Sequence, residues 1–132
     1  MAPPKLRILF SEDHPDTREM TCIILENEGF EVVCPDTSTQ VLSLAEKEQF
    51  DAFLLDSWTP GLDGIELCQR IRAFDRRTPI VFYSAAAYDG DRKRALAAGA
   101  QAYIAKPASM ERLVNTIRSI IQETNKPESL AM

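Results

Sequence analysis

Residues 52–56, Ala-Phe-Leu-Leu-Asp, form a short apolar run that ends on a carboxylate. Other short apolar runs also lead to polar side chains: residues 7–10 before Glu12 and Asp13, residues 80–83 before Ser84, and residues 103–105 before Lys106. If these runs are neighbouring parallel strands, their carboxyl ends meet at one edge of a sheet, where open α/β sheets bind ligands. The sequence therefore predicts carboxylates, a hydroxyl and an ammonium in one crevice.

Helical patterns lie between the apolar runs. The first helix is expected to begin at Pro15, to carry Met20, Ile23 and Ile24 as one apolar stripe, and to end at Gly29. The other expected elements are a strand at 30–34, a helix from Asp36 or Thr37 towards Phe50, helices at 65–71 and 89–98, a strand at 102–105, and a last helix at 110–121. The helix at 89–98 offers little apolar area, so we expect it to be the least firmly packed.

Alternation of strands and helices predicts an α/β fold, a doubly wound five-stranded parallel sheet with five helices over its two faces. The apolar runs support this fold, because strands buried on both sides need not alternate with polar residues. The chain has 132 residues, of which 45% are hydrophobic and 27% charged. We expect one domain over residues 5–123 and a polar tail or linker at 124–132.

Charge and cysteine content narrow the class of protein. The formal net charge of −5 and the pI near 4.9 argue against direct binding to nucleic acid. Neither a signal peptide nor a membrane-spanning run is evident, so we expect a cytoplasmic protein with no membrane contact. Cys22, Cys34 and Cys68 lack metal or redox spacing and are expected to be buried or half-buried reduced thiols, with a redox role as the alternative.

The carboxylates predicted in the crevice suggest a metal. Several carboxylates at one site repel each other unless a divalent cation lies between them, and oxygen ligands suit Mg²⁺. Glu12, Asp13 and Asp56 would then form a magnesium site. Lys106 would meet an anion instead. A magnesium ion, a lysine and a hydroxyl around a carboxylate indicate phosphoryl transfer.

The chain resembles the receiver domain of two-component response regulators over residues 5–123. The resemblance rests on features that occur in order along the chain: Glu12-Asp13, Asp56, Pro60, Asp63-Gly64, Ser84, Tyr103 and Lys106-Pro107. It implies a flavodoxin-like receiver topology and a phosphoprotein of phosphorelay signal transduction, which is not an enzyme. The implied partners are a histidine kinase or a histidine phosphotransfer protein, and an effector domain or a second copy bound through 89–98, 102–105 and the last helix.

The resemblance also implies a role for each site residue. Asp56 is the phosphoacceptor. Mg²⁺ is held by Glu12, Asp13, Asp56 and the backbone carbonyl of Trp58. Ser84 and Lys106 bind the phosphoryl oxygens, Ser84 and Tyr103 act as the conformational switch, and the bond before Pro107 is cis.

The chain departs from the family pattern close to the acceptor. Thr59 stands where many receivers carry methionine, Trp58 is bulkier than usual, and Ala86 offers no side chain to orient water. We therefore expect slow self-dephosphorylation, with a lifetime set by how far Trp58 shields the acyl phosphate.

Other interpretations of these residues remain open. A magnesium-dependent phosphatase with an aspartate nucleophile would carry a second aspartate at position 58, which is Trp58 here. A flavin or nucleotide binder would need a glycine-rich loop after the first strand, where Glu12 and Asp13 stand instead. A degenerate receiver could act only as a protein-interaction module. Taken singly, Asp56 could cap a turn, Ser84 could bond to backbone, Lys106 could be solvated, and Tyr103 could be core packing.

Overall fold

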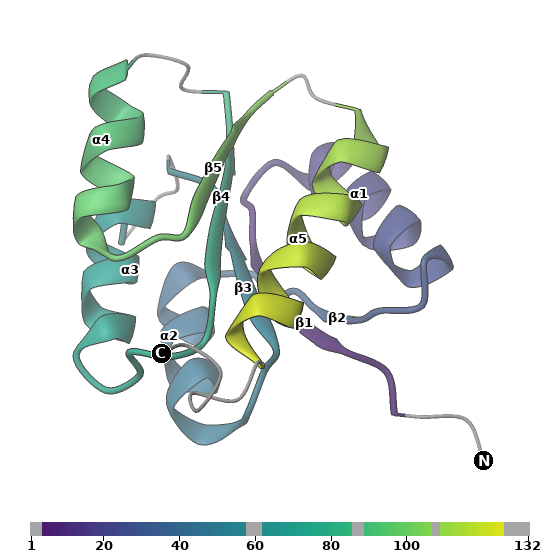
Figure 1. Ribbon diagram of the computed structural model, residues 1–132, viewed down its shortest axis with the longest axis horizontal. Coiled ribbons are helices and arrows are strands. Elements are labelled where there is room, and N and C mark those ends of the chain that lie inside the picture. The colour runs from purple at the N-terminus through teal and green to yellow at the C-terminus, as the bar shows by residue number, and fades with distance from the viewer. Residues whose placement is uncertain (1–3, 58–61, 86–88, 107–108, 126–132) are drawn as a thin grey trace.

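The computed structural model describes residues 4–57, 62–85, 89–106 and 109–125. Within these residues, five parallel strands form one sheet in the order β2-β1-β3-β4-β5 (Figure 1). The strands are β1 (Arg7–Ser11), β2 (Glu31–Val33), β3 (Ala52–Leu55), β4 (Ile80–Ser84) and β5 (Ala102–Ala105). The helices are α1 (Pro15–Asn27), α2 (Ser38–Lys47), α3 (Gly64–Arg72), α4 (Asp89–Ala98) and α5 (Met110–Thr124). The predicted doubly wound fold is confirmed.

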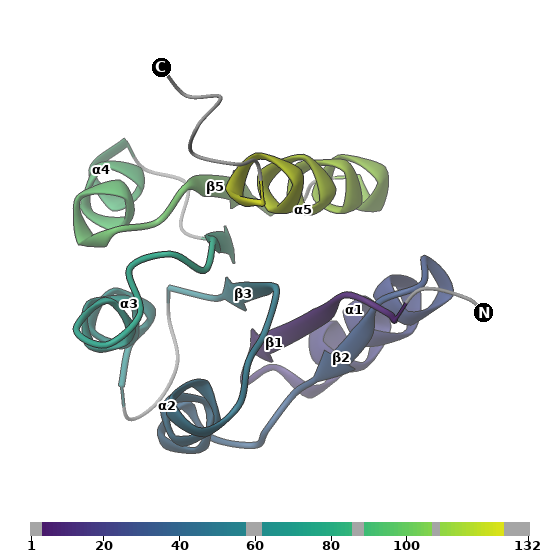
Figure 2. The ribbon, with the colours of Figure 1, turned by 60° about the horizontal axis from the view of Figure 1, so that its bottom comes forward.

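Helices cover both faces of the sheet. Figure 2 shows α1 and α5 on one side and α2, α3 and α4 on the other. Successive residues of β3 point into different cores: Phe53 and Leu55 pack towards α2 and α3, whereas Ala52 and Leu54 pack towards α1 and α5. Each position of the strand is buried, which explains why the sequence there is continuously apolar.

Several helices begin at a side-chain cap. The Thr37 hydroxyl accepts a hydrogen bond from the backbone N–H of Gln40, and the Gln40 side chain accepts one from Thr37, so Thr37 rather than Asp36 caps α2. Asp63 caps α3 and Ser109 caps α5 through similar bonds to the third residue of each helix. These caps set where three helices start relative to the strand ends.

The predicted apolar stripe of α1 is wrong for Met20 and Ile23, whereas its third member, Ile24, is half-buried. Met20 is 59% exposed and Ile23 is 50% exposed, whereas Thr21 and Leu25 are buried. Thr21 and Leu25 are four residues apart and share one face of the helix, and Met20 and Ile23 fall on the other side. The end of the helix is as expected, since Gly29 follows it with φ of 95°.

Helix α4 has the predicted bounds and buries little. Among residues 90–98, Ala95 alone is buried, and Leu96 is 41% exposed. Helix α5 instead buries Leu113, Val114, Ile117 and Ile121. The strand predicted at 30–34 is shorter than expected, because β2 spans only Glu31–Val33.

In the part of the chain that the structure describes, no helix combines the length and the apolar character needed to cross a bilayer.

Candidate functional site

The expected crevice lies at the carboxyl ends of β1, β3, β4 and β5. Glu12 and Asp13 follow β1, Asp56 follows β3, Ser84 ends β4 and Lys106 follows β5. Backbone hydrogen bonds extend the sheet to these positions. The N–H of Asp56 donates to the carbonyl of Ser11 at 3.1 Å, and that of Lys106 donates to the carbonyl of Ser84 at 2.8 Å. The sheet thereby fixes the backbone that carries the polar side chains.

Three carboxylates converge in this crevice. One oxygen from each of Glu12, Asp13 and Asp56 lies within 4.8 Å of the other two. Glu12 and Asp56 are buried, whereas Asp13 is exposed and leaves the cluster open to solvent on its side. Hard oxygen ligands of this number and spacing, with room for water, suit Mg²⁺. The residues present therefore fit the predicted metal.

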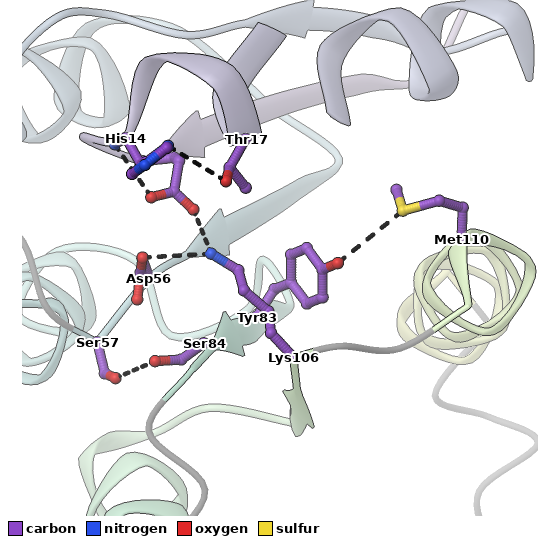
Figure 3. A network of polar contacts seen from close by, with 9 residues as sticks. His14, Thr17, Asp56, Ser57, Tyr83, Ser84, Lys106 and Met110 are labelled. Atoms are coloured by element: carbon purple, nitrogen blue, oxygen red, sulfur yellow. Dashed lines mark hydrogen bonds and ion pairs between the residues drawn. The ribbon is translucent and has the colours of Figure 1, made fainter. Parts of the chain in front are cut away.

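Lys106 lies between two of the carboxylates. Its ammonium is 2.5 Å from Oε1 of Glu12 and 3.5 Å from Oδ2 of Asp56, and it also lies 5.1 Å from the centre of the Tyr83 ring (Figure 3). Burial alone would lower the pKa of Lys106, but its bond to Glu12 and the charge of Asp56 together raise it. Lys106 is therefore charged and partly neutralises the cluster.

Burial affects the ionisation of the Glu12 carboxyl. Desolvation raises its pKa, the neighbouring Asp56 raises it further, and the bond from Lys106 opposes both effects. The backbone N–H of His14 donates to Oε2 of Glu12 at 3.2 Å. Glu12 is thus held from two sides, by a backbone amide and by an ammonium.

Ser84 contacts a hydroxyl that the sequence did not single out. Its Oγ lies 2.5 Å from Oγ of Ser57, the residue after Asp56 (Figure 3). The backbone N–H of Gly64 in turn donates to the carbonyl of Ser57 at 3.3 Å. The start of α3 therefore packs directly on the backbone that carries Asp56 and Ser57.

Tyr103 is buried on the same side of the sheet as Ser84. Its ring stacks on that of Phe82, with centroids 5.9 Å apart and planes inclined by 12°. Strands β4 and β5 pair Phe82 with Tyr103 and Ser84 with Ala105. Because side chains alternate along a strand, Ser84 lies on the same side of β4 as Phe82 and so on the side of Tyr103.

The structure brings together the predicted site residues Glu12, Asp13, Asp56, Ser84 and Lys106. It adds Ser57 and Tyr83. A contact with Tyr83 could have been anticipated, because Tyr83 and Lys106 stand at the ends of adjacent strands, but nothing in the sequence singles out Ser57.

Some expectations concern residues that the structure does not describe. The Trp58 carbonyl, Thr59 and Pro60, Ala86, the bond before Pro107, and residues 126–132 lie outside the described ranges.

The fold and the carboxylate cluster agree with the comparison to known proteins. A family model described as the response regulator receiver domain matches residues 8–118. The chain belongs to this family. This receiver domain has the five-stranded parallel sheet and the acidic cluster that its sequence predicted.

Relatives of the receiver domain include regulators and a sensor kinase. It is 37% identical to the transcriptional regulatory protein CseB from Streptomyces coelicolor, over 87% of this chain and 49% of CseB. It is 34% identical to the DNA-binding response regulator MtrA from Mycolicibacterium smegmatis, over 96% of this chain and 54% of MtrA. The chain thus spans about half the length of these two relatives.

A solved structure of similar fold is the receiver domain of the sensor histidine kinase PA1611 from Pseudomonas aeruginosa, which has a magnesium ion coordinated in its active site cleft. The TM-score is 0.83 and the identity 33%, with 89% of this chain and 98% of that chain covered.

Proposed function

We propose that this receiver domain accepts a phosphoryl group on Asp56 from a phosphohistidine of a histidine kinase or a histidine phosphotransfer protein. The observation that carries the proposal is the position of Lys106, whose ammonium lies between the carboxylates of Glu12 and Asp56. An ammonium beside the acceptor carboxylate can pass to a phosphoryl oxygen when one arrives. Catalysis of this transfer consists mainly of positioning and charge neutralisation.

In the proposed reaction, a carboxylate oxygen of Asp56 attacks the phosphorus. The new O–P bond forms as the N–P bond breaks, and the electron pair of that bond leaves with the donor imidazole. Asp56 is 7% exposed, so the donor must present its phosphoryl group at the mouth of the crevice. Lys106 neutralises charge on the transferred group, and the Ser84 hydroxyl donates a hydrogen bond to it.

Glu12, Asp13 and Asp56 would hold Mg²⁺ during the transfer, as their oxygen ligands and spacing allow. The ion, when bound, neutralises the carboxylates and the charge of the phosphoryl group. The magnesium reported for the receiver domain of PA1611 supports this assignment.

The proposed output is a population shift at the surface formed by α4, β5 and α5. Phosphorylation replaces the single negative charge of the Asp56 carboxylate with nearly two charges on the phosphoryl oxygens, and it draws the Ser84 hydroxyl towards them. Ser84 and Tyr103 lie on one side of adjacent strands, so a movement of Ser84 changes the packing around the tyrosine. The shallow packing of α4 supports a small energy difference between two arrangements. The partner at this surface would be an effector domain or a second copy.

The domain is proposed to act as a signalling domain and not as an enzyme that turns over a substrate. A cytoplasmic location stays a prediction. We expect no sustained hydrolysis when the protein is given a small phosphate ester. A phosphatase of this kind would need a second aspartate at position 58, where this chain has Trp58.

Intact mass spectrometry after incubation with Mg²⁺ and acetyl phosphate tests the proposal. We expect one added phosphate in the wild type and none in Asp56→Asn. Asp51→Asn is the matched control. Asp51 directly precedes β3, at the end of the strand opposite to Asp56, and its side chain accepts a hydrogen bond from the backbone N–H of Arg7 that asparagine can keep. Asp51→Asn should be phosphorylated like the wild type.

Two results would contradict the proposal. Phosphate on Asp56→Asn would place the acceptor elsewhere, and no adduct on a folded wild type would indicate a degenerate receiver.

A further inference from the structure

Two cysteines lie on neighbouring elements away from the carboxylate cluster. Cys22 belongs to α1, and Cys34 directly follows β2, the strand against which α1 packs (Figures 1 and 2). Both side chains are half-buried and pack against the same core cluster, which includes Leu25 and Phe30. The fold therefore brings two partly accessible thiols to one seam between a helix and an edge strand.

An ion pair fixes the same seam. Arg18 lies one turn before Cys22 on α1, and its guanidinium is 3.8 Å from the carboxylate of Asp36, two residues after Cys34. Residues four apart share one face of a helix, so Arg18 and Cys22 both face the segment that follows β2. The ion pair and the two sulfur atoms therefore lie at adjacent points along the contact between the helix and this segment.

The two thiols lie close enough to affect each other's pKa. The neighbouring Cys34 thiol lowers the pKa of Cys22, the Cys22 thiol raises that of Cys34, and the charge of Arg18 favours the thiolate at both. Cys68 is different: it is fully buried, its thiol donates to the carbonyl of Ala98 at 3.4 Å, and burial raises its pKa to about 11. Among the three cysteines, only Cys22 and Cys34 are partly accessible and close to another thiol, and Cys22, with its lowered pKa, is the nucleophile of the pair.

We propose that Cys22 and Cys34 form an oxidisable dithiol site, which hydrogen peroxide or another hydroperoxide converts to an intramolecular disulfide. The Cys22 thiolate attacks one peroxide oxygen and the O–O bond breaks, which leaves a sulfenic acid on Cys22 and releases water once the leaving hydroxide takes a proton. The Cys34 sulfur then attacks the Cys22 sulfur, the S–O bond breaks, and a second water leaves with the Cys34 proton. Two thiols and one hydrogen peroxide give one disulfide and two waters.

The disulfide would tie α1 to the segment after β2. Pro35, Asp36 and Thr37 of that segment line a small cavity of about 100 Å³, whose other side includes Glu12 and Asp13. Oxidation would therefore restrain one wall of the space beside the carboxylate cluster. The dithiol does not depend on phosphorylation of Asp56, so it can be tested on the reduced, unphosphorylated protein.

Counting thiols after peroxide treatment tests the site. The reduced protein is treated with hydrogen peroxide, denatured without reductant, alkylated with iodoacetamide and weighed. Untreated protein should take three alkyl groups, one on each cysteine, and oxidised wild type should take one, on Cys68. Dithiothreitol added before alkylation should restore three alkyl groups.

Proteolytic digestion identifies the linked cysteines. Trypsin leaves both Cys22 and Cys34 in the fragment 19–47, whereas cleavage after Glu26, Glu28 and Glu31 separates them. Digestion at glutamate should therefore give linked fragments only without reductant.

Cys68→Ser is the matched control and should lose both of its alkylation sites on oxidation. Cys22→Ser and Cys34→Ser should form no intramolecular disulfide, and the mapping of the wild type keeps the test valid if a variant folds poorly. Three alkylated cysteines after peroxide treatment, a disulfide that includes Cys68, or a bond between two chains would overturn the proposal.

Discussion

Gly64 shows how little space the site leaves at a single residue. A Cβ atom at this position would lie 2.2 Å from the carbonyl oxygen of Asp56 and 2.8 Å from Cα of Ser57. Both contacts are with backbone, which cannot rotate away as a flexible side chain would. Glycine is required here for close approach, since Gly64 is the first residue of α3 and has no positive φ.

We expect Gly64→Ala to lower the free energy of unfolding by about 2 kcal/mol or more, because the start of α3 must move off the Asp56 backbone. Gly90→Ala is the matched control. Gly90 lies in α4 with open space around its Cα, so alanine there should leave stability unchanged or raise it by less than about 1 kcal/mol. Urea unfolding measures both. Equal unfolding midpoints for the two variants would show that the close contact at Gly64 does not contribute to stability.

The hydroxyl pair of Ser57 and Ser84 gives a second prediction at this scale. Their oxygens lie 2.5 Å apart, so a double-mutant cycle with Ser57→Ala and Ser84→Ala should give a coupling of about 0.5 to 1.5 kcal/mol in the unphosphorylated protein. The cycle isolates the coupling energy of the pair, because the effects of all other interactions of each serine cancel. Additive effects of the two substitutions on urea unfolding would mean that the pair does not interact in solution.

Helices and strands differ in how well the sequence predicts them. The strand β3 was predicted to within one residue and the helix α4 with its observed bounds, because a strand buried on both faces is a continuous apolar run and Gly99 follows α4 as a helix stop. The stripe of α1 was predicted wrongly, because Met20 and Ile23 are apolar but lie on its outer face. Which face of a helix is buried depends on what packs there.

The same distinction applies to the candidate site. Glu12, Asp13, Asp56 and Lys106 could be predicted because each stands at a strand end, where topology alone determines proximity. The Ser57 contact could not, since it depends on the direction of side chains, whereas the Tyr83 contact follows from the place of Tyr83 near the end of a strand adjacent to β5. Tyr83 also reaches Met110 on α5, with 3.9 Å between Oη and Sδ (Figure 3).

The connection between α3 and β4 should make stability depend on pH. Asp75 accepts hydrogen bonds from the backbone of Arg77 and from the backbone and hydroxyl of Thr78, at 2.9, 3.0 and 2.6 Å. Burial alone would raise the pKa of Asp75, but these bonds and the charge of Arg72 lower it overall. A carboxyl with a lowered pKa in the folded state stabilises the protein above its ordinary pKa of about 3.9, and this stabilisation is lost as the pH falls below that range.

We therefore expect Asp75→Asn to unfold more easily than the wild type at neutral pH, by about 1 to 2 kcal/mol. The difference should shrink as the pH is lowered from about 4 towards 2, because the wild-type carboxyl then becomes neutral too. Urea titrations at several pH values measure the difference. A gap that stays constant down to the lowest pH would contradict the assignment to the ionised carboxylate.

The two helices at the proposed output surface should differ in local stability. Ala95 is the buried side chain among residues 90–98, whereas α5 buries Leu113, Val114, Ile117 and Ile121. Amide hydrogens in α4 should exchange about tenfold faster or more than those in α5, after correction for intrinsic rates. Hydrogen exchange measured by NMR gives both sets of rates. Similar protection in the two helices would show that α4 is held by more than its buried area.

At the scale of the whole molecule, the site concentrates negative charge at one end of the sheet. Glu12, Asp13 and Asp56 share that end with Lys106 as a compensating cation. A cation that binds only when these residues are brought together must favour the folded state, because the unfolded chain does not assemble the cluster.

Mg²⁺ should therefore raise the free energy of unfolding, by about 1.4 kcal/mol at a concentration roughly ten times its dissociation constant. Asp13→Asn should lose most of this increase, whereas Asp16→Asn, an exposed residue in the first turn of α1, should keep it. Thermal unfolding at fixed ionic strength, with and without Mg²⁺, measures the effect. An equal increase in both variants would indicate general salt screening instead of binding at the cluster.

The order of the strands also bears on how copies of the protein avoid aggregation. The strands at the two edges of the described sheet are short, three residues in β2 and four in β5. A short edge offers few unpaired backbone groups on which another chain could add a strand. We therefore expect the folded protein to resist edge-to-edge growth into fibrils at high concentration, so that association of intact copies would have to proceed through side chains.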